Sequence, residues 1–397
     1  MAIKPYEAVA MQTDHRETLG DKKAVMQNIE FWESQLDLHF AFCSFEYPVK
    51  LVAFPEGVMQ GWLWCLPDLA NPTKYARNGA IQVPGPESDR IGEMAKKFNT
   101  YIRFQAIATE PEWPDHFFNK SFIVDPKGKV ILQTYKHHVS YPIEPSNTPH
   151  DLWDEWVQKY VKKDDWKSWM DAFFPVVDTD IGKLGSLICG QTSYPEEGRG
   201  LRLNGAEVII KCNYMNPWTT RPSGSEGNFL LISRMHALVN TCYTVNPNYG
   251  TYYIGDVPYT IGGYSLICDY KGEVINQVGA ESNVSVAAPI DIEALRQWRQ
   301  SALGIGTTQI PLLRTEIFRK IYERPIYPIN ARKEKPFDNM LEVYNALKAV
   351  VNDLEKAGIN TPPEVSVEGG LESLDKSPYW DHMKKKYGPI LKQTGLM

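Results

Sequence analysis

Two segments that lie far apart in the chain share one pattern: a short apolar run, a turn that contains Lys-Gly, and a second apolar run. The first segment spans residues 117–133 and turns at Pro126-Lys127-Gly128, and the second spans residues 264–275 and turns at Lys271-Gly272. Gly and Pro are the residues that tight turns favour, so each segment is predicted to form a β-hairpin. Two hairpins so far apart predict a two-layer fold with internal similarity.

Short apolar runs alternate with helical patterns over most of the remaining chain. Between residues 21 and 38 the helical spacing places Val25, Ile29, Trp32 and Leu36 on one face. Alternation of this kind, combined with hairpins, is typical of an α/β fold. We expect one large domain over residues 1–330 and a C-terminal extension over residues 331–397. The other predicted strands span residues 6–11, 49–54, 101–109, 184–189, 208–212 and 241–246, and the other predicted helices span residues 88–99, 195–204 and 227–239.

Two segments stand apart from this alternation. Residues 145–174 form a charged insertion with four Trp, which we interpret as a pair of amphipathic surface helices; a lid or a subunit contact is the alternative. In the extension, apolar residues from Phe337 to Leu354 keep helical spacing until Gly358. This helix needs a surface to pack on, so the extension is expected to wrap the domain or a neighbouring subunit.

The composition argues against several classes of protein. The net charge of −6 comes without a basic stripe, so nucleic acid is not an expected partner. No apolar run approaches the roughly 18 residues of a membrane span, and the first residues lack the apolar core of a signal peptide. The six cysteines are scattered without a CxxC pair, which favours a reducing cytoplasm over a disulfide framework.

The same composition predicts neither a metal nor a cofactor. Among the eight histidines, His137-His138 is the one close pair, and adjacent side chains on a strand point to opposite faces. No glycine pattern of a dinucleotide-binding or phosphate-binding loop occurs.

Cys189 is the candidate nucleophile because it ends an apolar run and precedes a turn that starts at Gly190. A thiol at such a junction lies beside backbone N–H groups that no strand pairing uses, which suits attack on a carbonyl. The alternative is a small core residue, since free cysteine is often buried. A thiol nucleophile also needs a base and a positive group, and Glu56 and Lys136 each follow a predicted strand. Taken singly, each is better explained as a solvated charge at the end of a strand.

Together these residues resemble a known pattern. Phe54-Pro55-Glu56, Tyr135-Lys136 and Leu187-Ile188-Cys189, the last followed by Tyr194-Pro195-Glu196, occur in the order typical of the nitrilase, or carbon–nitrogen hydrolase, superfamily. The resemblance extends over about residues 5–325. It implies a four-layer αββα sandwich, a Cys-Glu-Lys centre that needs no metal or cofactor, and a homo-oligomer.

Within this superfamily the chain is most similar to the aliphatic amidase and formamidase branch. The features shared with it are Gln60-Gly61 after the first motif and Pro142-Ile143-Glu144, eight residues after Lys136. Gly190-Gln191 replaces both the Trp-Glu that usually follows the cysteine in nitrilases and the acidic pair of the amidases. N-carbamoyl amino acid hydrolases supply arginines just beyond the cysteine. Arg221 is the candidate substitute here, although a surface arginine in a loop is the favoured interpretation of it.

The resemblance implies a role for each candidate residue. Cys189 attacks the carbonyl after Glu56 takes its proton, Lys136 and the Gly190 N–H stabilise the oxyanion, and Glu144 helps to hold a small-molecule amide. An N-carbamoyl amide hydrolase, a nitrilase and a non-catalytic binding protein of the same fold remain as alternatives. The substrate pocket is expected to include Gly190, Tyr214, Met215, Asn216 and Trp218.

Overall fold

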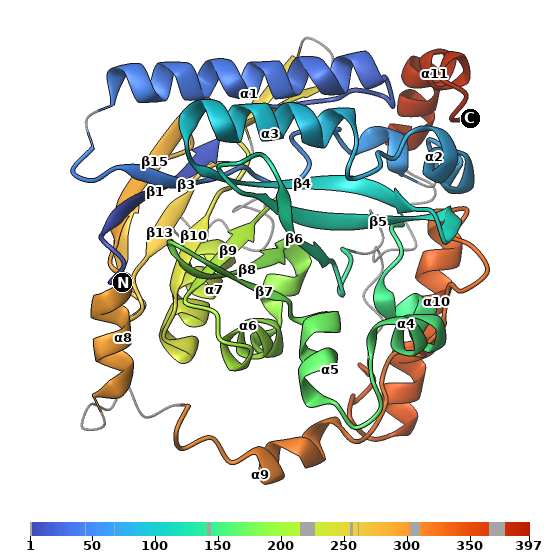
Figure 1. The fold of residues 1–397 in the computed structure, drawn as a ribbon. Helices are drawn as coiled ribbons and strands as arrows, with labels where there is room; N and C mark the ends of the chain where they lie inside the picture. The colour runs from blue at the N-terminus through green and yellow to red at the C-terminus, as the bar shows by residue number, and fades with distance from the viewer. Residues whose placement is uncertain are drawn as a thin grey trace.

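Two six-stranded β-sheets lie face to face between layers of helices (Figure 1). The structure is a computed structural model that describes residues 2–43, 45–66, 68–140, 144–214, 227–254, 257–260, 262–301, 310–364 and 378–397. The first sheet has the strand order β15-β1-β3-β4-β5-β6, and the second has the order β14-β13-β10-β9-β8-β7. This arrangement confirms the predicted αββα sandwich.

In the first sheet, β1, β3 and β4 run parallel, and antiparallel strands flank them on both sides. Helices α1 (Lys22–Phe42) and α3 (Pro86–Phe98) cover its outer face, and the four predicted core residues of α1 are all buried there. The helix α1 runs four residues beyond the predicted end. The strands are β1 (Tyr6–Gln12), β3 (Val49–Ala53), β4 (Tyr101–Glu110), β5 (Trp113–Val124), β6 (Val130–Tyr135) and β15 (Val284–Ile290).

The second sheet repeats this plan, with β8, β9 and β10 parallel at its centre and antiparallel strands on each side. Helices α6 (Pro195–Leu203) and α7 (Gly227–Asn240) cover its outer face. The predicted hairpins fall one in each sheet, at β5–β6 and β13–β14, which confirms the internal similarity. The strands are β7 (Val176–Thr179), β8 (Gly182–Ile188), β9 (Val208–Cys212), β10 (Tyr243–Asn246), β13 (Leu266–Cys268) and β14 (Val274–Gln277).

A buried arginine joins the two sheets inside the otherwise apolar layer between them. Arg103 on β4 donates to the hydroxyls of Ser121 (2.9 Å) and Ser186 (3.2 Å), one from each sheet. It also donates to the Phe54 carbonyl (2.9 Å) and contacts the sulfur of Cys212 on β9. Because a buried guanidinium is costly unless its donors are paired, these contacts favour one relative position of the sheets.

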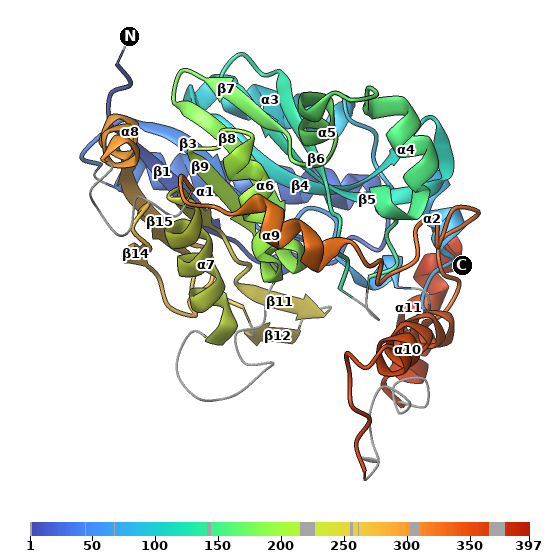
Figure 2. The same ribbon diagram turned by 90° about the horizontal axis from the view of Figure 1, so that it is seen from below.

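A small third sheet lies outside the sandwich. It consists of β2 (His15–Arg16), β11 (Thr251–Ile254) and β12 (Val257–Thr260), in the order β12-β11-β2 (Figure 2). The remaining elements are η1 (Leu63–Cys65), α2 (Pro72–Asn78), η2 (Pro149–Leu152), α4 (Trp153–Tyr160), α5 (Trp166–Phe173), η3 (Cys189–Ser193), α8 (Ile292–Gln300), α9 (Thr315–Arg319), η4 (Lys320–Tyr322), α10 (Met340–Lys356) and α11 (Pro378–Gln393).

The Trp-rich insertion forms the predicted pair of amphipathic helices, α4 and α5. Trp156 is buried against Trp113 and Tyr135 of the first sheet, whereas Trp166 is 60% exposed. A role as lid or subunit contact stays a prediction.

The C-terminal extension packs on its own chain. Helix α11 lies beside α2 (Figures 1 and 2), and the Asn71 N–H donates to the Leu396 carbonyl (2.7 Å). Arg332 is buried and donates to the Pro145 carbonyl (2.9 Å) and to Asp151 (2.5 Å). The domain boundary at residue 330 remains a prediction. Among the described helices, none has both the length and the apolar character that crossing a membrane requires.

Candidate active site

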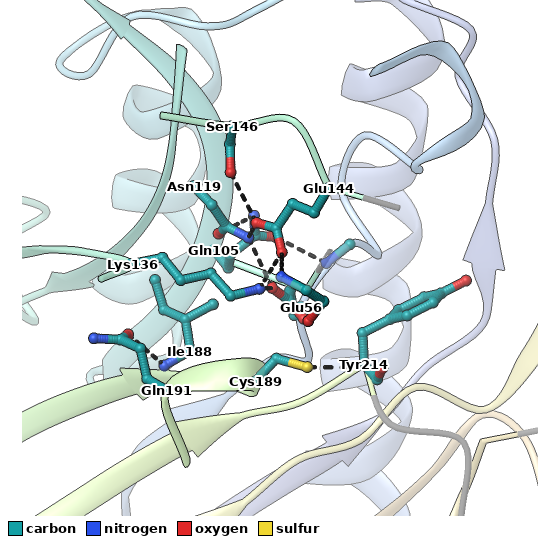
Figure 3. Close-up of polar contacts among 12 residues, drawn as sticks. Glu56, Gln105, Asn119, Lys136, Glu144, Ser146, Ile188, Cys189, Gln191 and Tyr214 are labelled. Atoms are coloured by element: carbon teal, nitrogen blue, oxygen red, sulfur yellow. Dashed lines mark hydrogen bonds and ion pairs between the residues drawn. The ribbon is translucent and has the colours of Figure 1, made fainter. Parts of the chain in front are cut away.

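The candidate catalytic residues come together where three strands end (Figure 3). Glu56 lies three residues after β3, Lys136 directly follows β6, and Cys189 directly follows β8. Glu144 reaches the same point from the segment after β6. All four side chains are buried, and Cys189 is the most exposed of them at 8%. The structure therefore brings the four predicted residues together.

Lys136 lies between the two carboxylates. Its ammonium donates to Glu56 Oε1 (2.8 Å) and to Glu144 Oε2 (2.6 Å). The Asn119 amide also donates to both carboxylates, to Glu56 Oε1 (2.7 Å) and Glu144 Oε1 (2.9 Å). Gln105 orients Asn119 by donating to its carbonyl oxygen (2.8 Å). Each carboxylate is thus held in one orientation by at least two donors.

The charges of this cluster set its resting protonation state. Burial by itself lowers the pKa of Lys136, but the carboxylates of Glu144 and Glu56 outweigh it and raise that pKa. Burial raises the pKa of Glu56 against the opposing effect of Lys136. Burial also opposes ionisation of Glu144, but Lys136 outweighs it and lowers the pKa of that carboxyl. Glu56 is therefore the more basic carboxylate of the pair.

The thiol of Cys189 is protonated at rest, because burial and the nearby Glu56 raise its pKa well above the ordinary value. Its backbone adopts a left-handed conformation, with φ of 36°, which is uncommon for a residue other than glycine and typical of functional sites. The carbonyl of Cys189 accepts from the Thr192 hydroxyl (2.6 Å), and its sulfur lies 3.8 Å from the Tyr214 carbonyl. Gly190 leaves no room for a side chain, because a Cβ there would lie 2.8 Å from the His138 carbonyl oxygen.

A second polar network links the segment around the nucleophile to the residues that follow β6. Glu197, buried at the start of α6, accepts from His137 (3.0 Å), His138 (3.1 Å) and Gln191 (3.1 Å). Gln191 in turn accepts from the Ile188 N–H (3.0 Å), directly before Cys189. Burial by itself raises the pKa of Glu197, but the two histidines outweigh it and lower that pKa to about 2.

This network corrects one sequence expectation. His137 and His138 lie beyond the end of β6, so they are not bound by strand alternation, and both reach the same carboxylate. Among the residues that the structure describes, no group of three or more His, Cys, Asp or Glu side chains is arranged to hold a metal ion.

The cluster opens into a cavity of about 270 Å³. Charged residues and Cys189 form part of its lining, and apolar and aromatic side chains form most of the rest. The lining residues are Glu56, Trp62, Leu63, Leu66, Lys136, Ser140, Glu144, Cys189, Tyr214 and Tyr252.

Comparison with known proteins identifies the family. The model of the carbon–nitrogen hydrolase family matches residues 11–300. The chain belongs to the carbon–nitrogen hydrolase family. Formamidases of Bacillus thuringiensis and Bacillus cereus are 28% identical to it over 234 residues, which is 58% of this chain and 59% of each relative. The match thus spans about three fifths of the length of these curated relatives.

Solved structures share the fold of this carbon–nitrogen hydrolase. A carbon–nitrogen hydrolase from Helicobacter pylori superposes with a TM-score of 0.60 at 17% identity, over 81% of this chain and 99% of that one. Nit3 of Saccharomyces cerevisiae, a member of branch 10 of the nitrilase superfamily, has a TM-score of 0.56 at 18% identity, over 77% and 96%. An amidase from Nesterenkonia has a TM-score of 0.53 at 14% identity, over 80% and 96%.

The predicted pocket residues of this carbon–nitrogen hydrolase have different outcomes. Tyr214 lines the cavity, and Gly190 lies beside it next to Cys189. The other predicted wall residues lie outside the described residues: Met215, Asn216, Trp218 and Arg221.

Two groups of site residues were not predicted from the sequence: those that orient the charged cluster, and the apolar residues that line the cavity. Asn119 and Gln105 lie inside strands that contain other polar residues, so nothing in the sequence sets their amides apart. Trp62, Leu63 and Leu66 follow the Gln60-Gly61 motif, but nothing in their spacing indicates that they face a site.

Proposed function

We propose that this carbon–nitrogen hydrolase cleaves the C–N bond of a carboxamide, giving a carboxylic acid and ammonia through a thioester on Cys189. The observation that carries the proposal is the buried ammonium of Lys136 between Glu56 and Glu144, in the same cavity as the Cys189 thiol. The names of the formamidase and amidase relatives support an amide as the substrate.

The first half-reaction forms the thioester. Glu56 takes the proton of Cys189 as the sulfur attacks the carbonyl carbon, because the neutral thiol is a weak nucleophile. The Lys136 ammonium and the Gly190 N–H stabilise the oxyanion, and one such donor is worth on the order of 3 kcal/mol. The C–N bond then breaks, and the leaving nitrogen takes the proton from Glu56 and departs as ammonia. Glu144 holds the amide nitrogen during this step.

The second half-reaction returns the enzyme to its resting state. A water molecule gives a proton to Glu56 and attacks the thioester carbonyl. The C–S bond breaks, the acid leaves, and the sulfur of Cys189 recovers the proton from Glu56. Glu56, the more basic carboxylate of the cluster, therefore acts in both halves.

The test is ammonia release from a panel of aliphatic, aromatic and N-carbamoyl amides with matched nitriles, measured beside Cys189→Ala. We expect release from amides that Cys189→Ala abolishes while its circular dichroism and melting temperature match the native protein. Full activity in Cys189→Ala would refute the nucleophile.

The same panel separates the alternative activities. Carbon dioxide together with ammonia would indicate an N-carbamoyl amide hydrolase, and acid from a nitrile would indicate a nitrilase. No release from any substrate by folded protein would favour a non-catalytic binding protein. Glu144→Gln is expected to lower turnover by at least tenfold in protein that remains folded.

A further inference from the structure

The apolar half of the cavity lining suits a group without charge. This apolar wall consists of Trp62, Leu63, Leu66, Tyr214 and Tyr252, and the rings of Trp62 and Tyr214 lie 5.8 Å apart. Among the described lining residues, every charged side chain belongs to the cluster of Glu56, Lys136 and Glu144. Outside the cluster, these described residues offer a second charge on the substrate no opposite charge with which to pair.

The cavity is also large for the smallest amide. Its volume of about 270 Å³ equals that of about nine water molecules at about 30 Å³ each. A formyl group would fill only a small part of this volume, whereas an acyl group of four or five carbons would fill more of it.

One buried carboxylate, that of Glu17, accepts hydrogen bonds from two segments of this apolar wall. Glu17 accepts from the backbone N–H groups of Trp62 (3.0 Å) and Leu63 (3.2 Å), where η1 begins. It also accepts from the hydroxyl of Tyr252 on β11 (2.9 Å). The Glu17 side chain is 5% exposed and pairs with His15 (2.9 Å). Because the N–H groups at a helix start have no partner within the helix, Glu17 supplies acceptors that η1 lacks.

Glu17 also packs closely against its surroundings. A Cβ at Gly61 would lie 2.1 Å from Glu17 Oε2, so this carboxylate packs directly on the backbone that leads into the wall. Its neighbour His15 belongs to β2, which pairs with β11 opposite Tyr252. The ring of His15 lies 4.4 Å from that of Tyr252 and 5.0 Å from that of Tyr214. The small sheet and Glu17 thus together fix the positions of Trp62, Leu63 and Tyr252 in the wall.

We propose that Glu17 is a positioning residue for the acyl-binding wall, and that this wall selects amides with an uncharged acyl group larger than formyl. The inference rests on the proposed amidase function, which depends on Cys189 and the charged cluster rather than on the wall.

The first experiment measures kcat/KM of the native protein for formamide, acetamide, propionamide, butyramide and isovaleramide, with succinamic acid as the charged comparison. We expect a rise of about fourfold for each added methylene up to four or five carbons, as the apolar half fills. Succinamic acid should be hydrolysed at least tenfold less efficiently than butyramide. Formamide as the best substrate, with Cys189 still required, would overturn the selection but leave the amidase function standing. No Cys189-dependent release from any amide would overturn both.

The second experiment compares Glu17→Gln with Glu207→Gln. Glu207 is a matched control, because it is also buried and also accepts from a backbone N–H, that of Lys183 (3.0 Å), but it does not line the cavity. We expect Glu17→Gln to reduce the ratio of kcat/KM for butyramide over formamide by about tenfold, mainly through KM. Glu207→Gln should leave that ratio unchanged. An equal ratio in the two variants would overturn the role of Glu17.

Two milder variants keep the proposal testable if Glu17→Gln does not fold. Tyr252→Phe removes only the hydroxyl that contacts Glu17 and should shift the same ratio in the same direction. Leu66→Trp fills the apolar half without touching the contacts of Glu17 and should move the preference toward formamide. If neither variant changes the ratio, the wall does not select the acyl group.

Discussion

Asn119 donates to both carboxylates of the cluster, as Lys136 does. Its amide lies 2.7 Å from Glu56 and 2.9 Å from Glu144. The hydrogen bond to Glu56 favours the ionised carboxylate and lowers its pKa against the effect of burial. Asn119 therefore keeps the proposed base free of a proton at lower pH.

Replacing Asn119 should change the pH dependence of catalysis. In Asn119→Ala the pKa of Glu56 rises, so Glu56 becomes protonated at a higher pH and the acidic limb of the kcat/KM profile moves toward neutral pH. We expect a loss of about tenfold or more at about pH 5, because a hydrogen bond to a charged group is worth about 1.5–3 kcal/mol. Asn246→Ala, which removes a buried amide in the second sheet, is the control. An acidic limb that moves equally in both variants, or in neither, would contradict this role.

The residues of the site divide according to the signal that they carry in the sequence. Glu56, Lys136 and Cys189 each follow a strand that the apolar pattern predicts, and the shared order of the motifs links them to one family. Asn119 lies in the middle of β5, where an amide is indistinguishable from any polar strand residue until the pairing of β5 with β4 is known. Glu17 could not be predicted either, because its partners are separated from it by 45 and 235 residues.

At the scale of elements, the end of β6 and the start of α6 are joined by Glu197. This carboxylate contacts His137 and His138 beyond β6, and Gln191 in η3. Because Lys136 directly precedes His137, and Cys189 begins η3, the network determines how far the lysine lies from the nucleophile. It carries out this role without touching the cavity's charged end.

The low pKa of Glu197 predicts an acid-dependent loss of stability. A carboxyl with a pKa near 4.5 in the unfolded chain and about 2 in the folded one stabilises the fold fully above pH 4.5. This contribution is lost as the pH falls from about 4.5 toward 2, and its size is on the order of 3 kcal/mol. Urea unfolding of Glu197→Gln should show a deficit near that size at about pH 6, which shrinks as the pH falls toward about 3. Glu273→Gln, at an exposed carboxylate, should show none, and a deficit in Glu197→Gln that is independent of pH would contradict the assignment.

The central elements of the fold could be predicted because each is long enough to show its period. The pattern over residues 21–38 predicted the inward face of α1, and the two Lys-Gly turns predicted one hairpin in each sheet. The small sheet was missed because β2 has two residues, and β11 and β12 have four each, which is too short for alternation to be visible. The pairing of β2 with β11 is set by tertiary contacts between segments that lie at opposite ends of the main domain.

At the scale of the whole molecule, the C-terminal residues reach back to the wall of the cavity. Met383, Tyr387, Leu391 and Leu396 are buried in one apolar cluster with Leu63 and Leu66. The last helix therefore contributes to the position of η1, although the two elements lie near opposite ends of the chain. Whether further copies of the chain assemble around this extension stays a prediction, which the mass of the native protein in solution would test.

Leu391 and Ile390 offer a matched comparison on α11. Leu391 is fully buried, whereas its neighbour Ile390 is 40% exposed. We expect Leu391→Ala to lower the free energy of unfolding by about 2–5 kcal/mol, as for other buried leucines. It should also raise KM for the larger amides, because the support of η1 is weakened. Ile390→Ala should change stability by about 0.5 kcal/mol or less. Equal effects of the two variants in thermal and kinetic assays would show that α11 does not support the wall.

The charge of the buried cluster also affects the release of the product. Two carboxylates share one ammonium, so the cluster has a net negative charge before any substrate enters. In the proposed reaction a carboxamide arrives neutral, but the acid formed from it ionises beside Glu56 and Glu144 and adds a third negative charge. Like charges about 4 Å apart repel by about 4 kcal/mol in such surroundings. The arrangement proposed to activate the thiol would therefore also favour release of the product and disfavour the reverse reaction.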